Sequence, residues 1–252
     1  MRYAVLTSGS CGNAYAFSDG GRTILVDMGL TLSGLKRRLE DVGIPFEGIS
    51  DVYVTHSHPD HSKGLGVLHR ATGATVHVSR KSFEVDRSVY ARLGLDEDRL
   101  SLFDFGDELA SGRFTLHPFA TSHDAAGSAG YFISNGSSRF FLMTDTGLYS
   151  DEAVELARRA DVLFVESNYD ELMLEEGRYP LFLKARIRGG RGHLSNSQSF
   201  RFLEESGSLG KPVFLVHLSD NNNTVQRVQQ LYAGRPSVVA CERGRTYGAY
   251  DV

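Results

Sequence analysis

The chain has 252 residues, of which 41% are hydrophobic and 23% charged, a composition typical of globular proteins. Its net charge of −4 gives no overall basic field, so binding a charged polymer would require a local basic path. Its only cysteines, Cys11 and Cys241, form no disulfide framework, and no stretch resembles a signal peptide or a membrane span. We therefore expect one domain, residues 1–252, in a cytoplasmic protein without membrane contact.

Short strands and helices alternate along the whole chain. In the first half the patterns predict strands at 3–6, 14–18, 23–27, 52–54 and 75–78, and helices at 32–42, 64–71 and 81–93. In the second half they predict strands at 114–119, 129–134, 140–144, 162–166, 213–217 and 238–240, and helices at 151–159, 197–205 and 224–231. Helices that recur between strands in both halves predict an α/β protein built as a four-layer αββα sandwich.

The most informative segment is residues 55–61, Thr-His-Ser-His-Pro-Asp-His, which directly follows the apolar strand 52–54. Three of the nine histidines fall within six residues, which chance in a polar loop explains poorly. Residues two apart on an extended segment share a face, so His56 and His58 can bind one metal ion. Asp60 and His61 lie past the turn and can reach a second ion. Imidazole nitrogen and carboxylate oxygen suit zinc, manganese or iron.

Other residues with suitable donor atoms stand at the ends of predicted strands, namely Asp27, His123, Asp145 and His217. The simplest assignment gives His56, His58 and His123 to one ion. It gives Asp60, His61 and His217 to the other. Asp145 would bridge the two ions, because a carboxylate has two oxygens, and Asp27 would anchor a ligating histidine or the turn by a hydrogen bond. A hydroxide between two such ions, zinc or manganese with iron also possible, could attack an ester at neutral pH.

These motifs resemble the metallo-β-lactamase superfamily, and within it the YycJ (WalJ-type) group. The resemblance covers nearly the whole chain and is carried by segments 8–13, 55–61, 121–125, 166–170, 179–181, 192–196, 217–219 and 221–223. It implies the metallo-β-lactamase sandwich fold and a DNA-processing phosphodiesterase with 5′-to-3′ exonuclease activity. One departure is Tyr169, where the family often carries histidine, so we leave this position out of the site.

A basic tract at residues 178–191 leads directly to His193. It contains five cationic side chains and no acid, namely Arg178, Lys184, Arg186, Arg188 and Arg191. Such a tract is what a nucleic-acid hydrolase needs, and arginine can bind phosphate with two hydrogen bonds. We therefore predict that Arg186 and Arg188 bind a DNA substrate. The alternative is a surface segment whose apolar residues at 179 and 181–183 pack into the core.

His193 is the main catalytic candidate beyond the metal ligands. Related phosphodiesterases use a histidine here to protonate the leaving oxygen, and Glu166 could orient it by a hydrogen bond. We name Asp60 and His193 as catalytic residues, and Ser195 and Asn196, which could also cap the following helix, as substrate-binding residues. The exchanged assignment, with His193 as the ligand and His217 as the acid, stays open. His217 is preferred as the ligand because it ends a strongly apolar strand.

Other functions on this fold are also open to a chain with this pattern. A small-molecule hydrolase, such as a cyclic phosphodiesterase, lactonase or thioesterase, is the main alternative, because fold alone does not fix the substrate. A diiron redox protein is disfavoured by His58, where such proteins usually carry glutamate, and by the absence of a flavin domain. A binding module is disfavoured because every expected ligand is present. The pattern leaves the oligomeric state open.

Overall fold

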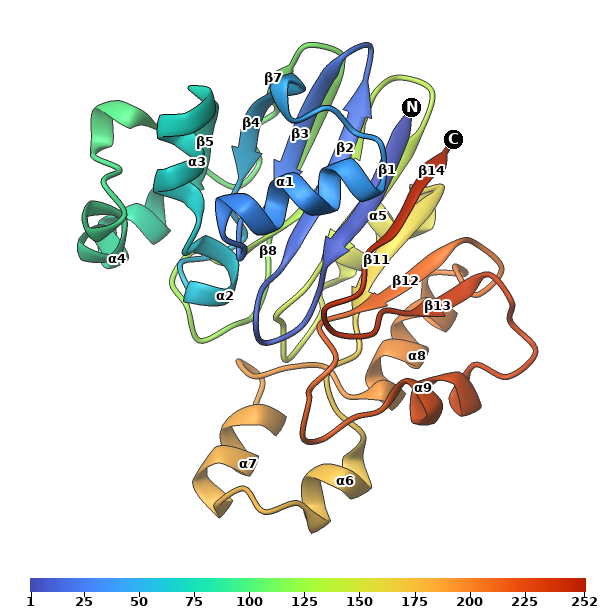
Figure 1. Ribbon diagram of the computed structural model, residues 1–252. Coiled ribbons are helices and arrows are strands. Elements are labelled where there is room, and N and C mark those ends of the chain that lie inside the picture. The colour runs from blue at the N-terminus through green and yellow to red at the C-terminus, as the bar shows by residue number, and fades with distance from the viewer.

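The computed structural model describes the backbone of residues 1–252 and every side chain except that of residue 99. Two seven-stranded sheets stand face to face (Figure 1). The first has the order β14 (Tyr247–Asp251), β1 (Arg2–Thr7), β2 (Ala14–Asp19), β3 (Arg22–Val26), β4 (Ile49–Tyr53), β5 (Thr75–Ser79) and β6 (Leu100–Phe103). The second has the order β13 (Val238–Ala240), β12 (Val213–Val216), β11 (Val162–Glu166), β10 (Arg139–Met143), β9 (Ala129–Ser134), β8 (Phe114–Ala120) and β7 (Leu109–Ser111).

Helices cover the outer faces of both sheets. The helices around the first sheet are α1 (Leu32–Asp41), α2 (Pro59–Ser62), α3 (Leu65–Thr72) and α4 (Arg80–Arg92), with 3-10 turns at Phe46–Gly48 and Glu97–Arg99. Those of the second half are α5 (Asp151–Arg159), α6 (Glu171–Glu176), α7 (Leu181–Arg188), α8 (Asn196–Glu205) and α9 (Val225–Leu231). Apolar residues of α1, α3 and α4 pack on the first sheet, and those of α5, α8 and α9 on the second. The predicted αββα sandwich is confirmed. None of the described helices is long and apolar enough to cross a membrane.

Strand alternation builds the central core between the sheets. Successive side chains of a strand point to opposite faces, so β1 sends Tyr3 and Val5 inward and Ala4 and Leu6 toward the helices. The inward face is rich in aromatic rings; the centroid of Tyr3 lies 5.2 Å from that of Phe140 on the opposite sheet. This packing fixes the two sheets against each other and therefore fixes the loops at their ends.

Several short elements were not predicted from the sequence, namely β6, β7, β14, α2, α6 and α7. β7 has only three residues, and β14 is an edge strand with mostly exposed residues, so neither shows a clear apolar alternation. Helices α6 and α7 lie around the basic tract and project below the sandwich in Figure 1. We call residues 171–188 the α6–α7 arm.

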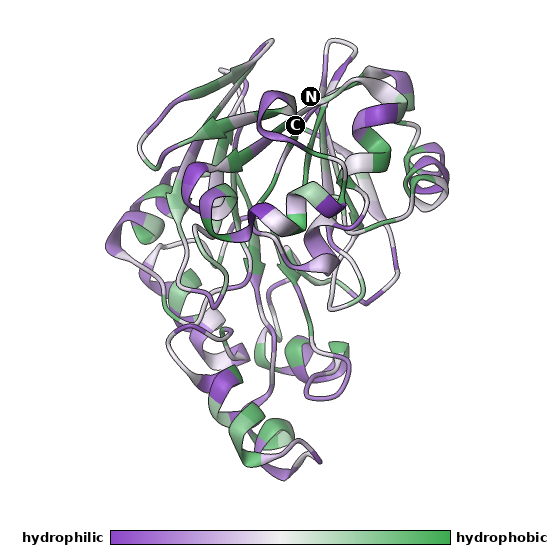
Figure 2. Cartoon of the chain, turned by 90° about the vertical axis from the view of Figure 1, so that its left-hand side faces the viewer, coloured by the Kyte–Doolittle hydropathy of each residue, from purple (hydrophilic) through white to green (hydrophobic). Residues whose placement is uncertain are grey.

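The α6–α7 arm carries apolar residues on its surface. Leu172, Leu181 and Phe182 are 59%, 82% and 76% exposed, and Figure 2 shows hydrophobic stretches on these projecting helices. The alternative that this segment packs into the core is therefore wrong for Leu181 and Phe182.

A buried carboxylate ties the two sheets together away from the strand ends that carry the histidines. Asp51 of β4 accepts hydrogen bonds from His77 Nε2 of β5 at 2.9 Å and from the Ser111 hydroxyl of β7. It also pairs with Arg22 of β3 at 3.2 Å. Burial raises the pKa of Asp51, but the hydrogen bonds from His77 and Ser111 outweigh it and lower the pKa from 3.8 to about 2.

We expect Asp51→Asn to lower the free energy of unfolding by about 1–3 kcal/mol at neutral pH, because it leaves buried donors without their charged acceptor. Asp104→Asn, which removes an exposed carboxylate paired with Arg80, is the matched control and should change little. The lowered pKa stabilises the fold above pH 3.8, and this contribution disappears as the pH falls through about 2. Urea unfolding at several pH values should therefore show that the free energies of unfolding of the wild-type protein and of Asp51→Asn become equal in acid. A difference that stays constant with pH would contradict the role given to Asp51.

Candidate metal centre

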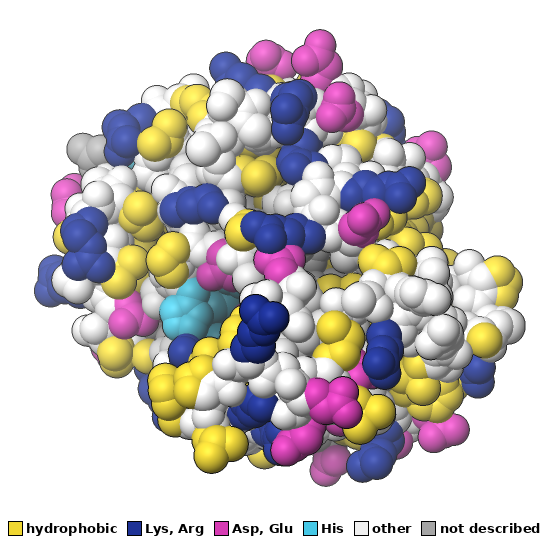
Figure 3. All heavy atoms as spheres, turned by 60° about the horizontal axis from the view of Figure 1, so that its bottom comes forward, with side chains coloured by type: hydrophobic (Ala, Val, Ile, Leu, Met, Phe, Trp, Pro, Cys, Tyr) yellow, Lys and Arg dark blue, Asp and Glu magenta, His cyan; other side chains and the backbone are white. Residues whose placement is uncertain are grey.

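The predicted ligands come together at one edge of the sandwich, where strands of both sheets end. The first sheet supplies Asp27 after β3 and the 55–61 turn after β4. The second supplies His123 after β8, Asp145 after β10 and His217 after β12. Viewed toward this edge, the molecule has a hollow in which histidine atoms are exposed (Figure 3). The carboxyl ends of neighbouring parallel strands lie at the same edge of a sheet, which is why residues so distant in sequence meet here.

Three of these residues have an unusual backbone conformation. Asp27, Asp145 and His217 have φ values of +62°, +54° and +57°, and they are the non-glycine residues with positive φ in the described backbone. Such conformations cost about 1–3 kcal/mol each and persist only where the surrounding structure enforces them. They also explain why β3 and β12 end one residue earlier than predicted, since a left-handed residue cannot continue a strand. The strain is concentrated at the candidate site.

Backbone hydrogen bonds from neighbouring loops of the first sheet hold the histidine turn, residues 55–61, in place. His58 is the extended N-cap residue of α2, and Asp60 and His61 lie within that short helix, directly after the turn. The amide of Asn13 donates to the Asp60 carbonyl at 2.7 Å, and that of Met28 to the His61 carbonyl at 2.8 Å. Gly29 permits this contact, because a Cβ there would collide with the Asp60 carbonyl oxygen.

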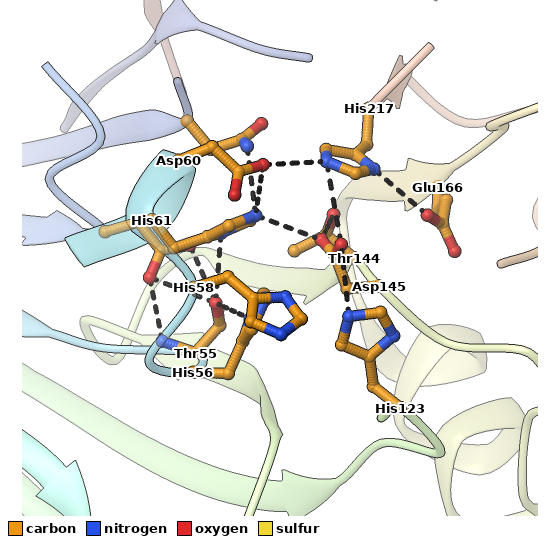
Figure 4. A network of polar contacts seen from close by, with 12 residues as sticks. Thr55, His56, His58, Asp60, His61, His123, Thr144, Asp145, Glu166 and His217 are labelled. Carbon is orange, nitrogen blue, oxygen red and sulfur yellow. Dashed lines mark hydrogen bonds and ion pairs between the residues drawn. The ribbon is translucent and has the colours of Figure 1, made fainter. Parts of the chain in front are cut away.

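The first ligand cluster contains His56, His58 and His123. Their candidate ligand atoms lie within 4.8 Å of one another, and Figure 4 shows the three rings converging. Two of these atoms, Nε2 of His56 and Nε2 of His123, are buried and have no hydrogen-bond partner among the described residues. A buried imidazole nitrogen without a partner is costly, so this pair of vacant nitrogens fits a bound cation.

The second cluster contains Asp60, His61 and His217, with Asp145 between the two clusters. Nε2 of His61 lies 3.4 Å from Asp60 Oδ2 and 3.3 Å from Asp145 Oδ2. The other Asp145 oxygen, Oδ1, lies 3.5 Å from His217 Nε2 and 3.8 Å from His123 Nε2. Asp145 Oδ2 thus faces His61 of the second cluster, and Oδ1 lies between His217 of the second cluster and His123 of the first. The carboxylate therefore stands beside both clusters, which is the place a bridging ligand requires.

Asp27 is fully buried and anchors the second cluster rather than joining it. His61 Nδ1 donates to Asp27 Oδ2 at 2.7 Å, and the Thr55 amide donates to Oδ1 at 2.8 Å. This contact fixes the ring so that Nε2 of His61 faces Asp60 and Asp145. Asp27 thus holds the His61 ring and the first residue of the turn, and its role beside a metal ligand stays a prediction.

Glu166, at the end of β11, is also fully buried and contacts two histidines. His193 Nδ1 donates to Glu166 Oε1 at 2.7 Å, and His217 Nδ1 lies 3.2 Å from the same oxygen. The amides of Thr146 and Leu194 donate to Oε2, each at 3.0 Å. One carboxylate therefore orients His193 and His217 together, with the ring centroids 5.4 Å apart.

Burial and the neighbouring carboxylates shift the pKa values of the histidines at this edge in opposite directions. Burial holds the pKa of His56 and His123 below the ordinary value, so both imidazoles are neutral and can act as ligands. Burial also lowers the pKa of His217, but the Asp145 carboxylate and its neighbours outweigh it and raise that pKa to about 10. His217 therefore tends to keep a proton that a bound cation would displace. The imidazole and carboxylate donors of the two clusters fit a divalent metal.

The predicted substrate residues divide into two groups. Arg186 and Arg188 lie on α7 and are largely exposed, but each already has an acidic partner: Asp124 at 2.5 Å and Glu175, respectively. Ser195 and Asn196 are 2% and 3% exposed. The prediction that they bind substrate was wrong, because Ser195 caps α8 and Asn196 is hydrogen-bonded to Ser167.

Other residues around the centre were not predicted as part of it. The Ser8 hydroxyl accepts from the His217 amide at 2.7 Å, and Asn13 Nδ2 lies 3.0 Å from His61 Nε2. Asn168 Nδ2 donates to the His217 carbonyl at 2.8 Å. Asp124 lies 3.4 Å from His123 Nε2. All four residues lie within the segments that carry the family resemblance, and Asp124 also directly follows a predicted ligand, so only their sequence context could have indicated them.

The chain shows clear similarity to known proteins. Residues 22–218 match the beta-lactamase superfamily domain. The whole chain is 32% identical to exodeoxyribonuclease WalJ of Streptococcus pneumoniae serotype 2 (strain D39), over 94% of that protein. It is also 32% identical to exodeoxyribonuclease YycJ of Bacillus anthracis, over 88% of this chain and 84% of that protein. The chain belongs to the beta-lactamase superfamily. Within it, the chain is a member of the group of WalJ and YycJ, as its motifs predicted.

Solved structures of the beta-lactamase superfamily share this fold. The metallo-beta-lactamase fold protein YhfI from Bacillus subtilis has a TM-score of 0.71 at 19% identity, over 98% of this chain and 99% of that one. The short form of human tRNase Z has a TM-score of 0.68 at 16% identity, over 100% of both chains. At these identities the likeness concerns the fold alone, and it confirms the predicted fold class.

Proposed function

We propose that this protein is a metal-dependent exonuclease that hydrolyses DNA from the 5′ end with two divalent ions, zinc or manganese. Full-length identity of 32% to an exodeoxyribonuclease supports the exonuclease activity. The observation that carries the proposal is Asp145, whose carboxylate lies between two groups of candidate ligands, within 3.8 Å of His123 Nε2 in one and within 3.5 Å of His61 Nε2 and His217 Nε2 in the other. The 5′-to-3′ direction rests on the resemblance to the YycJ group.

The ligand roles follow from this geometry. His56, His58 and His123 would hold one ion. Asp60, His61 and His217 would hold the other, and Asp145 would contact both. His217 is preferred over His193 as a ligand because its Nε2 lies 3.4 Å from Asp60 Oδ2 and it groups with both Asp60 and His61. The ligand atoms of His193 group with those of Asp145, Glu166 and His217 but not with those of Asp60 or His61. Bound divalent ions lower the pKa of coordinated water and so supply a nucleophile at neutral pH.

Asp60 and His193 are the residues placed to handle protons. Asp60 is 23% exposed at its side chain, more than His61, His217 or Asp145, so its carboxylate can accept a hydrogen bond from the attacking water. His193 is 21% exposed, and Glu166 holds its Nδ1, which leaves Nε2 available to protonate the leaving oxygen. A general acid matters here because the leaving group of a phosphodiester is poor.

A pocket beside the centre would receive the scissile phosphate. It measures about 180 Å³, and its polar lining includes Ser10, Asn168, Tyr179, Arg186, His193 and Ser219. Pockets that enclose a whole small molecule usually measure about 300–1,000 Å³, so most of the substrate must stay outside this one. That feature favours one phosphodiester group of a polymer over a bulky small molecule.

The α6–α7 arm offers a surface for the part of the substrate outside the pocket. Phe182 and Leu181 are exposed at the start of α7, and Arg186 and Arg188 follow toward its end. Proteins that bind single strands combine basic side chains with exposed rings on which bases stack. The same combination on α7 supports a nucleic-acid substrate.

The proposal is tested with DNA duplexes labelled at either the 5′ or the 3′ end and protein stripped of metal. We expect the 5′ label to be released stepwise as short products after manganese or zinc is restored. Asp145→Ala should lose both metal binding and cleavage, whereas Asp104→Ala, an acid outside the centre, should retain both. Release from the 3′ end first would contradict the direction. Intact DNA with cleavage of bis-p-nitrophenyl phosphate would instead identify a hydrolase of small phosphodiesters.

We expect His193→Ala to keep the metal content of the wild-type protein but to lower the turnover number by about 10²–10⁴-fold, because a general acid is removed. His117→Ala, which changes a half-buried histidine of β8 paired with Glu152, is the matched control. Metal content by plasma mass spectrometry and single-turnover cleavage of labelled DNA measure the two effects separately. Loss of metal from His193→Ala would instead make His193 a ligand and favour the exchanged assignment.

We expect the double variant Arg186→Gln, Arg188→Gln to weaken DNA binding. The slope of log affinity against log salt should fall by about 0.7–0.9 for each phosphate that the protein no longer neutralises. The double variant Arg158→Gln, Arg159→Gln at the end of α5 removes the same charge away from the pocket and should keep the wild-type slope. Fluorescence anisotropy with labelled DNA over a range of salt concentrations measures both. Equal slopes for the two double variants would remove α7 from the substrate path.

A further inference from the structure

Asp124 lies against the first ligand cluster, although neither the family pattern nor the sequence gave it a role. Its Oδ1 is 3.4 Å from His123 Nε2 and 3.7 Å from His58 Nε2. This oxygen is buried and has no hydrogen-bond partner among the described residues. A carboxylate oxygen in that position is costly unless a cation or a donor compensates it.

The vacant atoms around this point form one set. Besides Asp124 Oδ1, the buried atoms without partners include His56 Nε2 and His123 Nε2. Neighbouring ligand atoms about 2.0–2.2 Å from one ion stand about 3.0–3.5 Å apart, which includes the 3.4 Å between Asp124 and His123. A cation held by the three histidines would lie beside Asp124 Oδ1 through His123 and His58, so a small shift of this carboxylate would bring its vacant oxygen to the ion.

We propose that Asp124 is an additional ligand of the metal ion held by His56, His58 and His123. The inference rests on the proposed metal centre and extends it. With Asp124 and Asp145 the cluster would offer two carboxylates beside three imidazoles. Extra carboxylate oxygens suit manganese better than zinc, which prefers four ligands rich in nitrogen or sulfur. Asp124 would therefore shift the preference of this site toward manganese.

Arg186 holds the outer oxygen of the same carboxylate. Its Nε donates to Asp124 Oδ2 at 2.5 Å, so Oδ1 is left facing the histidines. The loop of Asp124 is tied to the segment after α7 by further contacts: the Ser122 hydroxyl donates to the Gly190 carbonyl at 2.6 Å, and Arg191 Nε to the His123 carbonyl at 3.0 Å. Arg186 is thus a positioning residue that connects the substrate arm to a metal ligand.

The alternative is that Asp124 serves only to hold Arg186. The two possibilities differ in what the variants do to metal affinity. If Asp124 is a ligand, Asp124→Asn should weaken metal binding far more than Arg186→Met, which leaves the carboxylate in place. If Asp124 only holds Arg186, both variants should bind metal like the wild-type protein and show the same weakened affinity for DNA.

The test is equilibrium dialysis of the metal-stripped full-length protein against manganese and, separately, zinc. We expect Asp124→Asn to weaken manganese binding to one site at least tenfold, to weaken zinc binding less, and to leave the other site unchanged. Glu175→Gln, which removes the acid paired with Arg188 of the same helix, is the matched control. Wild-type affinities for both metals in Asp124→Asn would overturn the proposal.

His58→Ala separates failure of this inference from failure of the metal centre. It should lose one site, and if it binds both metals like the wild-type protein, the proposed centre itself is wrong. Thermal unfolding of the metal-free variants checks that each one folds. If Asp124→Asn does not fold, the visible absorption of bound Co²⁺ in Asp124→Glu is compared with that of the wild-type protein. An unchanged spectrum would overturn the proposal, because a longer side chain cannot place its carboxylate in the same way.

Discussion

The burial of carboxylates beneath the strand ends is the constraint on which the centre depends. Asp27, Asp145 and Glu166 are at most 3% exposed, a position that an uncompensated charge cannot hold in a folded protein. Each is compensated by imidazole: His61 donates to Asp27, His193 to Glu166, and the ring nitrogens of several histidines surround Asp145. The same contacts fix the tautomer and orientation of the rings. Stability of this edge and placement of the ligands therefore arise from one set of interactions.

The sandwich supplies the rigidity that these contacts need. Each sheet delivers part of the site, and the aromatic core between the sheets holds the two parts in register. Left-handed backbone at Asp27, Asp145 and His217 turns the chain sharply just after each of three strands. Segments that are distant in sequence then hold these turns in place; for example, the Ser8 hydroxyl accepts a hydrogen bond from the His217 amide. A site assembled in this way tolerates strain because packing far from the ligands opposes its relaxation.

The sequence predicted the architecture, and it predicted which residues would lie together at this edge, because both depend on local patterns. Apolar alternation identified most strands, and polar residues directly after them identified Asp27, Asp145 and His217. The sequence was a poorer guide to features that depend on contacts between segments distant in the chain. Residues 195 and 196 looked available beside His193, but the capping of α8 buries them. The α6–α7 arm was missed because its apolar residues face outward, so it shows no core-facing period.

The basic tract shows most clearly why local sequence is insufficient for electrostatics. Its cationic residues have no acid between them in the chain, yet Asp124 pairs with Arg186 and Glu175 pairs with Arg188 from other segments. The free positive charge on α7 is therefore smaller than the sequence implies. A phosphate that binds Arg186 must share it with Asp124 or displace that carboxylate. Asp124 also faces His58 and His123, so a phosphate that draws Arg186 away from Asp124 would change the position or charge of a carboxylate beside the first ligand cluster.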